Sequence, residues 1–204
     1  MTAPNHASGT EAALRQDIVD YGRRFAPSGL SQGTSGNLSV RWRMGEHDGL
    51  LITPSGVDYG RMSAQDLPFM RLDDGSWSGP LKPSSEWRFH RDIYLARPEV
   101  GAIVHAHPTH TTALAVQRRE LPAFHYMVAM AGGRDIRCAP YATYGTEALS
   151  HNALAALQGR RACLLANHGL IAVGANLASA FALAIEVEQL AQQYPKDPLV
   201  TLHV

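Results

Sequence analysis

Hydrophobic positions along the chain follow two spacings, one typical of helices and one typical of strands. Apolar residues between Ala12 and Tyr21 recur at helical spacing, which predicts an amphipathic helix that ends near Pro27. Later stretches begin with a capping residue or end at a helix breaker. On these grounds we expect four further helices, over residues 84–96, 109–117, 146–157 and 177–194.

Shorter apolar runs, bounded by glycine and polar residues, predict strands. Residues 38–42 and 50–53 flank a turn over 45–49 and are expected to pair as a hairpin. Because some strands follow one another directly and others alternate with helices, the pattern predicts an α/β fold with a mixed sheet. The remaining strands are expected over residues 69–72, 102–107, 162–166 and 170–173.

The composition fits one globular domain. The chain has 204 residues, 45% of them hydrophobic, and it contains no long uninterrupted apolar segment, so we expect no membrane association. Residues 1–10 lack the features of a signal peptide and are expected to form a short disordered lead. A single domain over residues 11–204 should follow.

Charge and cysteine content narrow the partners and the compartment. Lys+Arg and Asp+Glu number 18 each, and no basic cluster stands out, which argues against a nucleic-acid partner and favours a small molecule. Cys138 and Cys163 are too few to form a disulfide framework, which is typical of a reducing compartment. We therefore expect a cytoplasmic protein.

Two histidines interrupt the apolar run at residues 103–108. Side chains alternate along a strand, so His105 and His107 should share one face while Ala106 points away. Two neighbouring imidazoles can ligate one divalent ion. A hydrogen-bonded pair of core histidines is the alternative that this spacing leaves open.

A third histidine, His168, lies in a polar turn between two expected strands. A histidine before a glycine is often an ordinary turn residue. Together with His105 and His107, however, it would complete three imidazoles, which with one open position are typical of a catalytic zinc site.

The segment 82–86 places Ser84, Ser85 and Glu86 at the expected start of a helix. Free backbone N–H groups and the positive end of the helix dipole favour an anion there, most commonly phosphate. The glycine-rich turns at 34–37 and 53–56 offer similar contacts. Taken one at a time, a helix cap and two plain turns explain these segments equally well.

Five motifs occur in an order that resembles the class II aldolase/adducin family, and the match covers nearly the whole chain. They are Ser-Gly-Asn at 35–37, Thr-Pro-Ser-Gly at 53–56, Pro-Ser-Ser-Glu at 83–86, His-Ala-His at 105–107 and Asn-His-Gly at 167–169. Within the family, longer matches at 86–90, 125–133 and 138–143 are most similar to the L-fuculose-phosphate aldolase branch.

The resemblance implies a three-layer α/β/α sandwich around a mixed, largely antiparallel sheet, and a homotetramer with active sites between neighbouring subunits. It implies one Zn²⁺ per subunit, or another divalent ion, held by His105, His107, His168 and Glu86. Glu86 would also move the substrate proton, and Tyr126 of the adjacent subunit would give a proton to the aldehyde oxygen. Positions that match the family's phosphate-binding residues are Gly36, Asn37, Ser55, Gly56, Ser84 and Ser85.

The implied reaction is zinc-dependent aldol cleavage or condensation of a ketose 1-phosphate. It gives dihydroxyacetone phosphate and a short aldehyde through a metal-stabilised enediolate. The expected substrate is similar to L-fuculose 1-phosphate. Two departures leave the aldehyde open: Tyr144 stands where the family aldolase has an aromatic without a hydroxyl, and the chain ends at Val204, short of the family's C-terminal tail.

Other members of the family are alternatives. Sugar-phosphate epimerases, decarboxylases and dehydratases share the scaffold with non-catalytic adducin-like binding modules. The sequence has Glu86 where the epimerase pattern has aspartate, and it has no acidic residue near Tyr126, which disfavours an epimerase. The complete set of three histidines and Glu86 disfavours a binding module.

Overall fold

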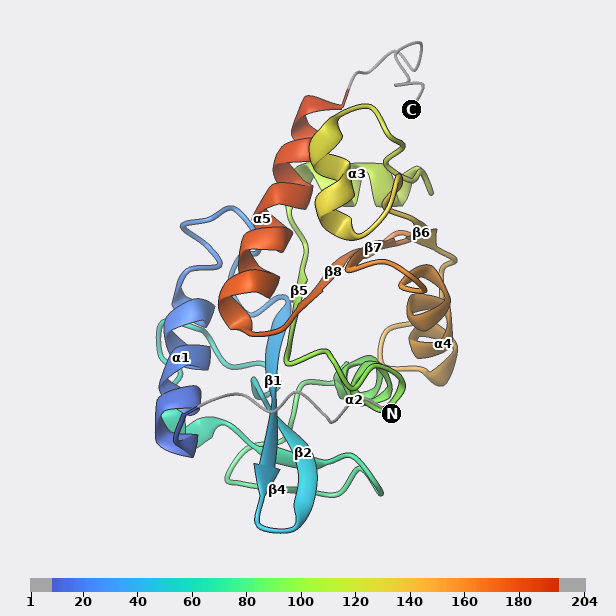
Figure 1. Cartoon of the computed structure of the whole chain (residues 1–204). Coiled ribbons are helices and arrows are strands. Elements are labelled where there is room, and N and C mark those ends of the chain that lie inside the picture. Colours follow the sequence, from blue (N-terminus) through green and yellow to red (C-terminus); the bar gives the residue numbers. More distant parts are fainter. Residues whose placement is uncertain (1–8, 195–204) are drawn as a thin grey trace.

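The computed structural model describes residues 9–194, and eight strands in this part of the chain form one sheet (Figure 1). The strands are β1 (Asn37–Met44), β2 (His47–Ile52), β3 (Phe69–Arg71), β4 (Trp77–Ser78), β5 (Ala102–Ala106), β6 (Cys138–Ala139), β7 (Ala162–Leu165) and β8 (Gly169–Gly174). Their order is β4-β3-β2-β1-β5-β8-β7-β6, and among these strands only β6 and β7 pair in parallel. The expected mixed, largely antiparallel sheet is confirmed.

Helices cover both faces of the sheet, which gives the expected three layers (Figure 1). One hydrophobic cluster contains Ile18 of α1, Leu114 of α3 and Phe181 of α5, whereas a second contains Phe89 of α2 and Leu149 of α4. The helices are α1 (Glu11–Arg23), α2 (Trp87–Ala96), α3 (Thr109–Val116), α4 (Glu147–Ala156) and α5 (Leu177–Gln193), with the 3-10 turns η1 (Ala64–Asp66) and η2 (Tyr126–Ala131).

The helix expected over residues 84–96 begins later than its polar residues predicted. Its first helical residue is Trp87, so Ser84 and Ser85 precede the helix and Glu86 occupies the N-cap position. The Glu86 side chain makes no capping hydrogen bond to α2, which leaves its carboxylate free for other contacts. The expectation that all three polar residues lie at the start of the helix is therefore wrong for Ser84 and Ser85.

The first hairpin has a tighter turn than the expected 45–49. Met44 pairs with His47, so only two residues form the turn. Gly45 has φ +61° at the first of these positions, a conformation that glycine adopts at no steric cost. Because the turn is tight, both strands extend beyond the apolar runs that predicted them: β1 continues to Met44 and β2 begins at His47.

Residues 1–8 and 195–204 lie outside the described residues, and with them most of the expected lead and the chain end at Val204. The first helix begins directly after Thr10, whose hydroxyl accepts a hydrogen bond from the Ala13 N–H at 3.3 Å. None of the helices between residues 9 and 194 has the length and apolarity that crossing a bilayer requires.

Candidate metal centre and substrate cavity

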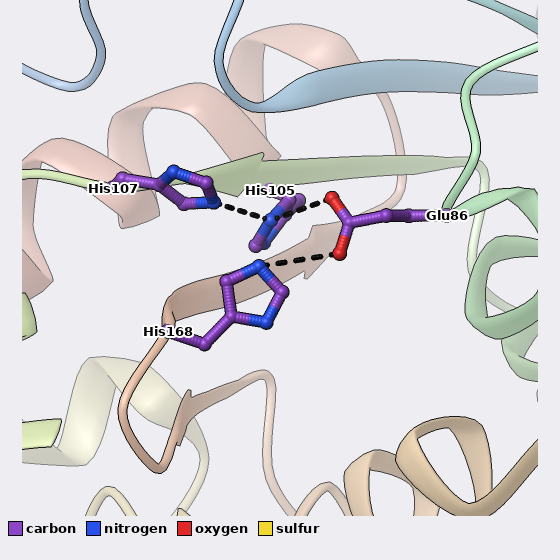
Figure 2. Close-up of side chains that lie close together, drawn as sticks. All are labelled: Glu86, His105, His107 and His168. Atoms are coloured by element: carbon purple, nitrogen blue, oxygen red, sulfur yellow. Dashed lines mark hydrogen bonds and ion pairs between the residues drawn. The ribbon is translucent and has the colours of Figure 1, made fainter. Parts of the chain in front are cut away.

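The four side chains expected to bind metal lie together and point toward one another (Figure 2). Glu86 precedes α2, His105 lies on β5, His107 follows the end of β5, and His168 occupies the turn between β7 and β8. One ligand atom from each lies within 4.8 Å of the others. The fold thus assembles the cluster from three separate parts of the sequence.

Strand alternation and one backbone contact fix the orientation of His105. Val104 and Ala106 belong to the cluster beneath α1, α3 and α5, whereas His105 faces the α2 side and meets the Phe89 ring edge-on at 5.3 Å between centroids. His105 Nδ1 lies 2.8 Å from the carbonyl oxygen of Leu170. Because a carbonyl oxygen only accepts, Nδ1 carries the hydrogen and Nε2 is the atom that points into the cluster.

The turn before β8 positions His168. Asn167 has a left-handed φ of +58°, and its backbone N–H donates to the carbonyl of Ala115 at 3.0 Å. The backbone N–H of His168 donates to the carbonyl of Leu165 at 3.0 Å. These contacts place His168 Nε2 at 3.2 Å from Glu86 Oε1.

The contacts inside the cluster fit a bound cation. His105 Nε2 lies 3.1 Å from Glu86 Oε2 and 2.9 Å from His107 Nε2. In neutral His105 this nitrogen carries a lone pair, which would then face a carboxylate oxygen and a second ring nitrogen. None of the described residues donates a hydrogen bond to Glu86 Oε1, although this oxygen is buried. A cation that accepts these lone pairs removes the repulsion, so the donor set suits a divalent metal.

Electrostatics within the cluster favour an ionised Glu86 and a neutral His107, the states in which these two groups bind a metal. Burial raises the pKa of Glu86, but electrostatic attraction to His105 and His168 outweighs burial and holds the pKa well below its usual range. Burial, and then repulsion from His105 and His168, lowers the pKa of His107 to about 3. Burial also lowers the pKa of His105, yet attraction to Glu86 outweighs burial and the net shift of the pKa is upward, so a cation and a proton compete for His105 Nε2.

A cavity of about 380 Å³ opens beside the cluster, and Glu86, His107 and His168 line it. His105 is fully buried. None of the described residues that line the cavity is lysine or arginine. All six residues expected to bind phosphate line the same cavity, namely Gly36, Asn37, Ser55, Gly56, Ser84 and Ser85.

Ser84 keeps a hydroxyl hydrogen available to the cavity. Its Oγ accepts a hydrogen bond from Asn37 Nδ2 at 3.0 Å and another from the Glu86 backbone N–H at 3.3 Å. A hydroxyl has two acceptor lone pairs and one hydrogen, so both lone pairs are in use and only the hydrogen remains. Ser84 therefore meets a ligand as a donor, which suits an anion.

Tyr126 lies apart from this cavity in the single chain. It begins η2, its side chain is 76% exposed, and it is not among the described residues that line the cavity. Its expected role depends on a neighbouring subunit, and one chain does not test that role.

Sequence reasoning assigned no role to several residues that the fold brings to the site. Tyr141, Tyr144 and Asn167 line the cavity. His90 is fully buried and contacts Asn37, yet its position in the sequence carries no spacing signal that links it to the cluster. Asn167 belongs to the Asn-His-Gly motif. Its left-handed backbone conformation, which the motif alone does not reveal, shapes the turn that carries His168.

Comparison with known proteins agrees with the geometry. The family model for the class II aldolase and adducin N-terminal domain matches residues 16–194. The 5-methylthioribulose-1-phosphate/5-deoxyribulose-1-phosphate aldolase of Rhodospirillum rubrum is 55% identical over 186 residues, which cover 91% of this chain and 82% of that protein. The L-fuculose phosphate aldolase of Escherichia coli strain K12 is 48% identical over 181 residues, which cover 89% of this chain and 82% of that protein.

Solved structures give the same result. An L-fuculose 1-phosphate aldolase superposes with a TM-score of 0.87 at 42% identity, covering 97% of this chain and 93% of that chain. The L-fuculose-1-phosphate aldolase of Thermus thermophilus superposes with a TM-score of 0.76 at 31% identity, covering 89% of this chain and 92% of that chain. The sequence motifs, the three-layer fold and the cluster of three histidines and a glutamate agree with these likenesses, and the chain belongs to the class II aldolase family.

Proposed function

We propose that the protein catalyses the reversible aldol cleavage of a ketose 1-phosphate to dihydroxyacetone phosphate and a short aldehyde. One observation carries the proposal: Glu86, His105, His107 and His168 converge beside a cavity whose other walls offer neutral donors. Aldolase activity agrees with the family, and relatives named for 5-methylthioribulose 1-phosphate, 5-deoxyribulose 1-phosphate and L-fuculose phosphate support a sugar phosphate as substrate.

We infer that the metal is Zn²⁺, held by the three histidines and Glu86. Four ligands in a tetrahedron about 2.0 to 2.1 Å from zinc are separated by about 3.4 Å. The contacts of 2.9, 3.1 and 3.2 Å between ligand atoms in the cluster lie near this value. When bound, the cation supplies positive charge beside the substrate oxygens on which negative charge develops as the carbon–carbon bond breaks.

Glu86 is the proposed proton carrier. Its carboxylate lines the cavity, and its lowered pKa keeps it ionised at neutral pH. A carboxylate within hydrogen-bond reach of the bound carbon acid can take a proton from dihydroxyacetone phosphate in condensation and return it after cleavage. Asn37 Nδ2 donates to Glu86 Oε2 at 3.0 Å and fixes where that oxygen lies.

The substrate phosphate is proposed to lie among Gly36, Asn37, Ser55, Gly56, Ser84 and Ser85. Gly36 has φ +78°, and a Cβ at this position would lie 2.6 Å from the carbonyl oxygen of His105. The turn therefore approaches β5, the strand that carries His105, closely only because residue 36 has no side chain. The phosphate positions line the same cavity as Glu86, His107 and His168, so one small sugar phosphate in this cavity would contact both groups.

We also propose a homotetramer in which Tyr126 of an adjacent subunit gives a proton to the aldehyde oxygen. The support is the exposure of Tyr126 on η2, a 3-10 turn that also carries the half-exposed Met130. Exposed aromatic and methionine side chains are typical of surfaces that pair with another protein.

The substrate is tested by incubating the purified protein with L-fuculose 1-phosphate, 5-deoxyribulose 1-phosphate and 5-methylthioribulose 1-phosphate, and by measuring dihydroxyacetone phosphate release. In the reverse direction, dihydroxyacetone phosphate and a panel of short aldehydes should give new ketose 1-phosphates. Failure to cleave any 1-phosphate, together with failure to condense any aldehyde, would contradict the proposed reaction.

The role of Glu86 is tested by Glu86→Gln. This variant should keep much of the metal, because a carboxamide preserves the size of the side chain, but it should lose exchange of the dihydroxyacetone phosphate proton with solvent. His105→Ala, the matched control, should lose both metal and exchange. Exchange at the wild-type rate in Glu86→Gln would remove Glu86 from the proton-transfer step.

A further inference from the structure

His90 is a buried histidine outside the proposed metal cluster. Only one of its two ring nitrogens, Nε2, contacts a residue that lines the cavity. His90 is fully buried on α2. Its Nδ1 lies 2.7 Å from Ser39 Oγ, which in turn lies 2.9 Å from Tyr94 OH. Its Nε2 contacts Asn37 Oδ1, and the same Asn37 donates from Nδ2 to Glu86 Oε2 at 3.0 Å. A continuous chain of hydrogen bonds therefore runs from Tyr94 to Glu86.

The negative charge of Glu86 sets the direction of every bond in this chain. An ionised carboxylate only accepts, so Asn37 must turn its NH₂ group toward Glu86 and its oxygen toward His90. His90 Nε2 must then carry a hydrogen to donate to that oxygen. Burial, and then repulsion from His105, lowers the pKa of His90 to about 3, so the ring is neutral and Nδ1 accepts from Ser39.

The far end of the chain agrees with this direction. With the Ser39 hydrogen given to His90, Ser39 Oγ must accept from Tyr94 OH. Burial raises the pKa of Tyr94, which keeps its hydroxyl protonated and able to donate. Each member thus donates toward Glu86, and aligned hydrogen bonds of this kind strengthen one another.

Two matching spacings place the members of the chain. Asn37 and Ser39 are two residues apart on β1 and share its α2-facing side, while His90 and Tyr94 are four residues apart on α2 and share the sheet-facing side. Both pairs are buried. The two polar residues of β1 therefore pack against the two polar residues of α2, and of these four only Asn37 lines the cavity.

We propose that His90 is a positioning residue: as its Nε2–H tautomer it holds the Asn37 amide in the orientation that fixes the Glu86 carboxylate. This inference rests on the proposed role of Glu86 as the proton carrier. His90 does not line the cavity and acts on the reaction only through Asn37.

Two amide substitutions of His90 distinguish the role of Nε2 from the role of Nδ1. In His90→Gln the side-chain amide reaches the position of Nε2 and can donate to Asn37, whereas in His90→Asn it reaches only the position of Nδ1. We expect proton exchange on dihydroxyacetone phosphate to fall about 10- to 100-fold in His90→Asn, the usual size of effect for a residue behind a metal ligand. His90→Gln should stay close to the wild-type rate.

Ser150→Ala is the matched control. Ser150 Oγ donates to Asp92 on the same helix as His90 at 2.6 Å, so its loss disturbs the packing of α2 without touching the chain of hydrogen bonds. We expect lower stability and an unchanged exchange rate. Equal loss in His90→Asn and His90→Gln, or loss of the same size in Ser150→Ala, would overturn the inference.

A second readout does not depend on activity. The ¹⁵N shifts of the His90 ring, measured in wild-type protein before and after metal chelation, should show a neutral ring with hydrogen on Nε2. A hydrogen on Nδ1, or a doubly protonated ring, would overturn the inference. Absence of exchange in wild-type protein would instead count against the proposed function, and the ring tautomer would still test the orientation of Asn37.

Discussion

Asn167 has the backbone conformation of a glycine directly beside His168. Its φ of +58° lies in the left-handed region, which costs most side chains about 1–2 kcal/mol, and asparagine tolerates it better than most. Its side-chain oxygen contacts Arg118 Nε at 3.4 Å. Asn167 therefore lets the chain turn sharply enough to present His168, a proposed metal ligand.

This conformation predicts that glycine is more stable than alanine at position 167, the reverse of their order within a helix. Asn167→Ala should be less stable than Asn167→Gly by about 1 kcal/mol in the free energy of unfolding, because only glycine takes a positive φ without strain. At Gln16, an exposed position within α1, alanine should instead be more stable than glycine by a similar amount. Urea unfolding of the four variants measures both differences. The same order at both positions would show that the turn relaxes.

The three histidines proposed as metal ligands could be predicted from local features of the sequence. His105 and His107 are two residues apart, and His168 sits in a recognisable turn. The hydrogen-bond partners behind them could not be found, because Asn37 meets His90 across 53 residues of sequence and Glu86 across 49. Contacts of this kind depend on how a helix packs on a sheet, and no motif records them.

At the scale of elements, α3 depends on a carboxylate from another helix. Pro108 is its N-cap residue and provides no side-chain hydrogen bond. Buried Glu188 of α5 accepts hydrogen bonds from the backbone N–H groups of His110 at 2.8 Å and Thr111 at 2.9 Å, and from the Thr111 hydroxyl at 3.0 Å. Since α3 begins two residues after His107, this contact also anchors the segment that carries a proposed metal ligand.

Glu188→Gln should therefore lower the free energy of unfolding by about 1–3 kcal/mol. The amide replaces one charged acceptor with a donor that faces N–H groups, and it removes a negative charge from a helix N-terminus. Glu186→Gln, at a partly exposed position of the same helix, should change stability by less than about 0.5 kcal/mol. Chemical denaturation gives both values, and an effect of equal size in the two variants would contradict the assigned contact.

Elements with a clear apolar pattern were predictable, whereas strands of only two residues, and the burial of polar side chains on a predicted strand, were not. The strands of two residues, β4 and β6, are too short to show alternation. The alternation in β1 is typical of a strand with one solvent face, yet Ser39 and Arg41 are buried against α2. Arg41 Nε donates to the carbonyl of Val100 at 3.0 Å, and such satisfied polar groups look like surface residues until the packing is known.

At the scale of the whole molecule, the proposed tetramer makes a complementation experiment decisive. His105→Ala subunits lack the metal site but keep Tyr126, and Tyr126→Phe subunits keep the metal site but lack the hydroxyl. If Tyr126 acts across a subunit interface, co-expressed mixed oligomers should be more active than either variant alone. Tyr126→Phe by itself should slow bond cleavage and leave phosphate affinity unchanged.

The result distinguishes the two arrangements of the site. No gain in mixed oligomers would place Tyr126 outside the active site or in the same chain as its metal. Light scattering on each preparation checks that the subunits assemble. A wild-type cleavage rate in Tyr126→Phe would remove this residue from the mechanism.

None of the described residues that line the cavity is lysine or arginine, so the proposed binding of the cation and that of the sugar phosphate should be coupled. A sugar phosphate that enters before the cation meets the carboxylate of Glu86 as its nearest formal charge, whereas one that enters afterwards meets an excess of positive charge. The affinity for the phosphate must then rise when the cation is bound. The affinity for the cation must rise by the same factor when the phosphate is bound. Calorimetric titration of inorganic phosphate into chelated and zinc-loaded protein measures that factor, which should be well above one.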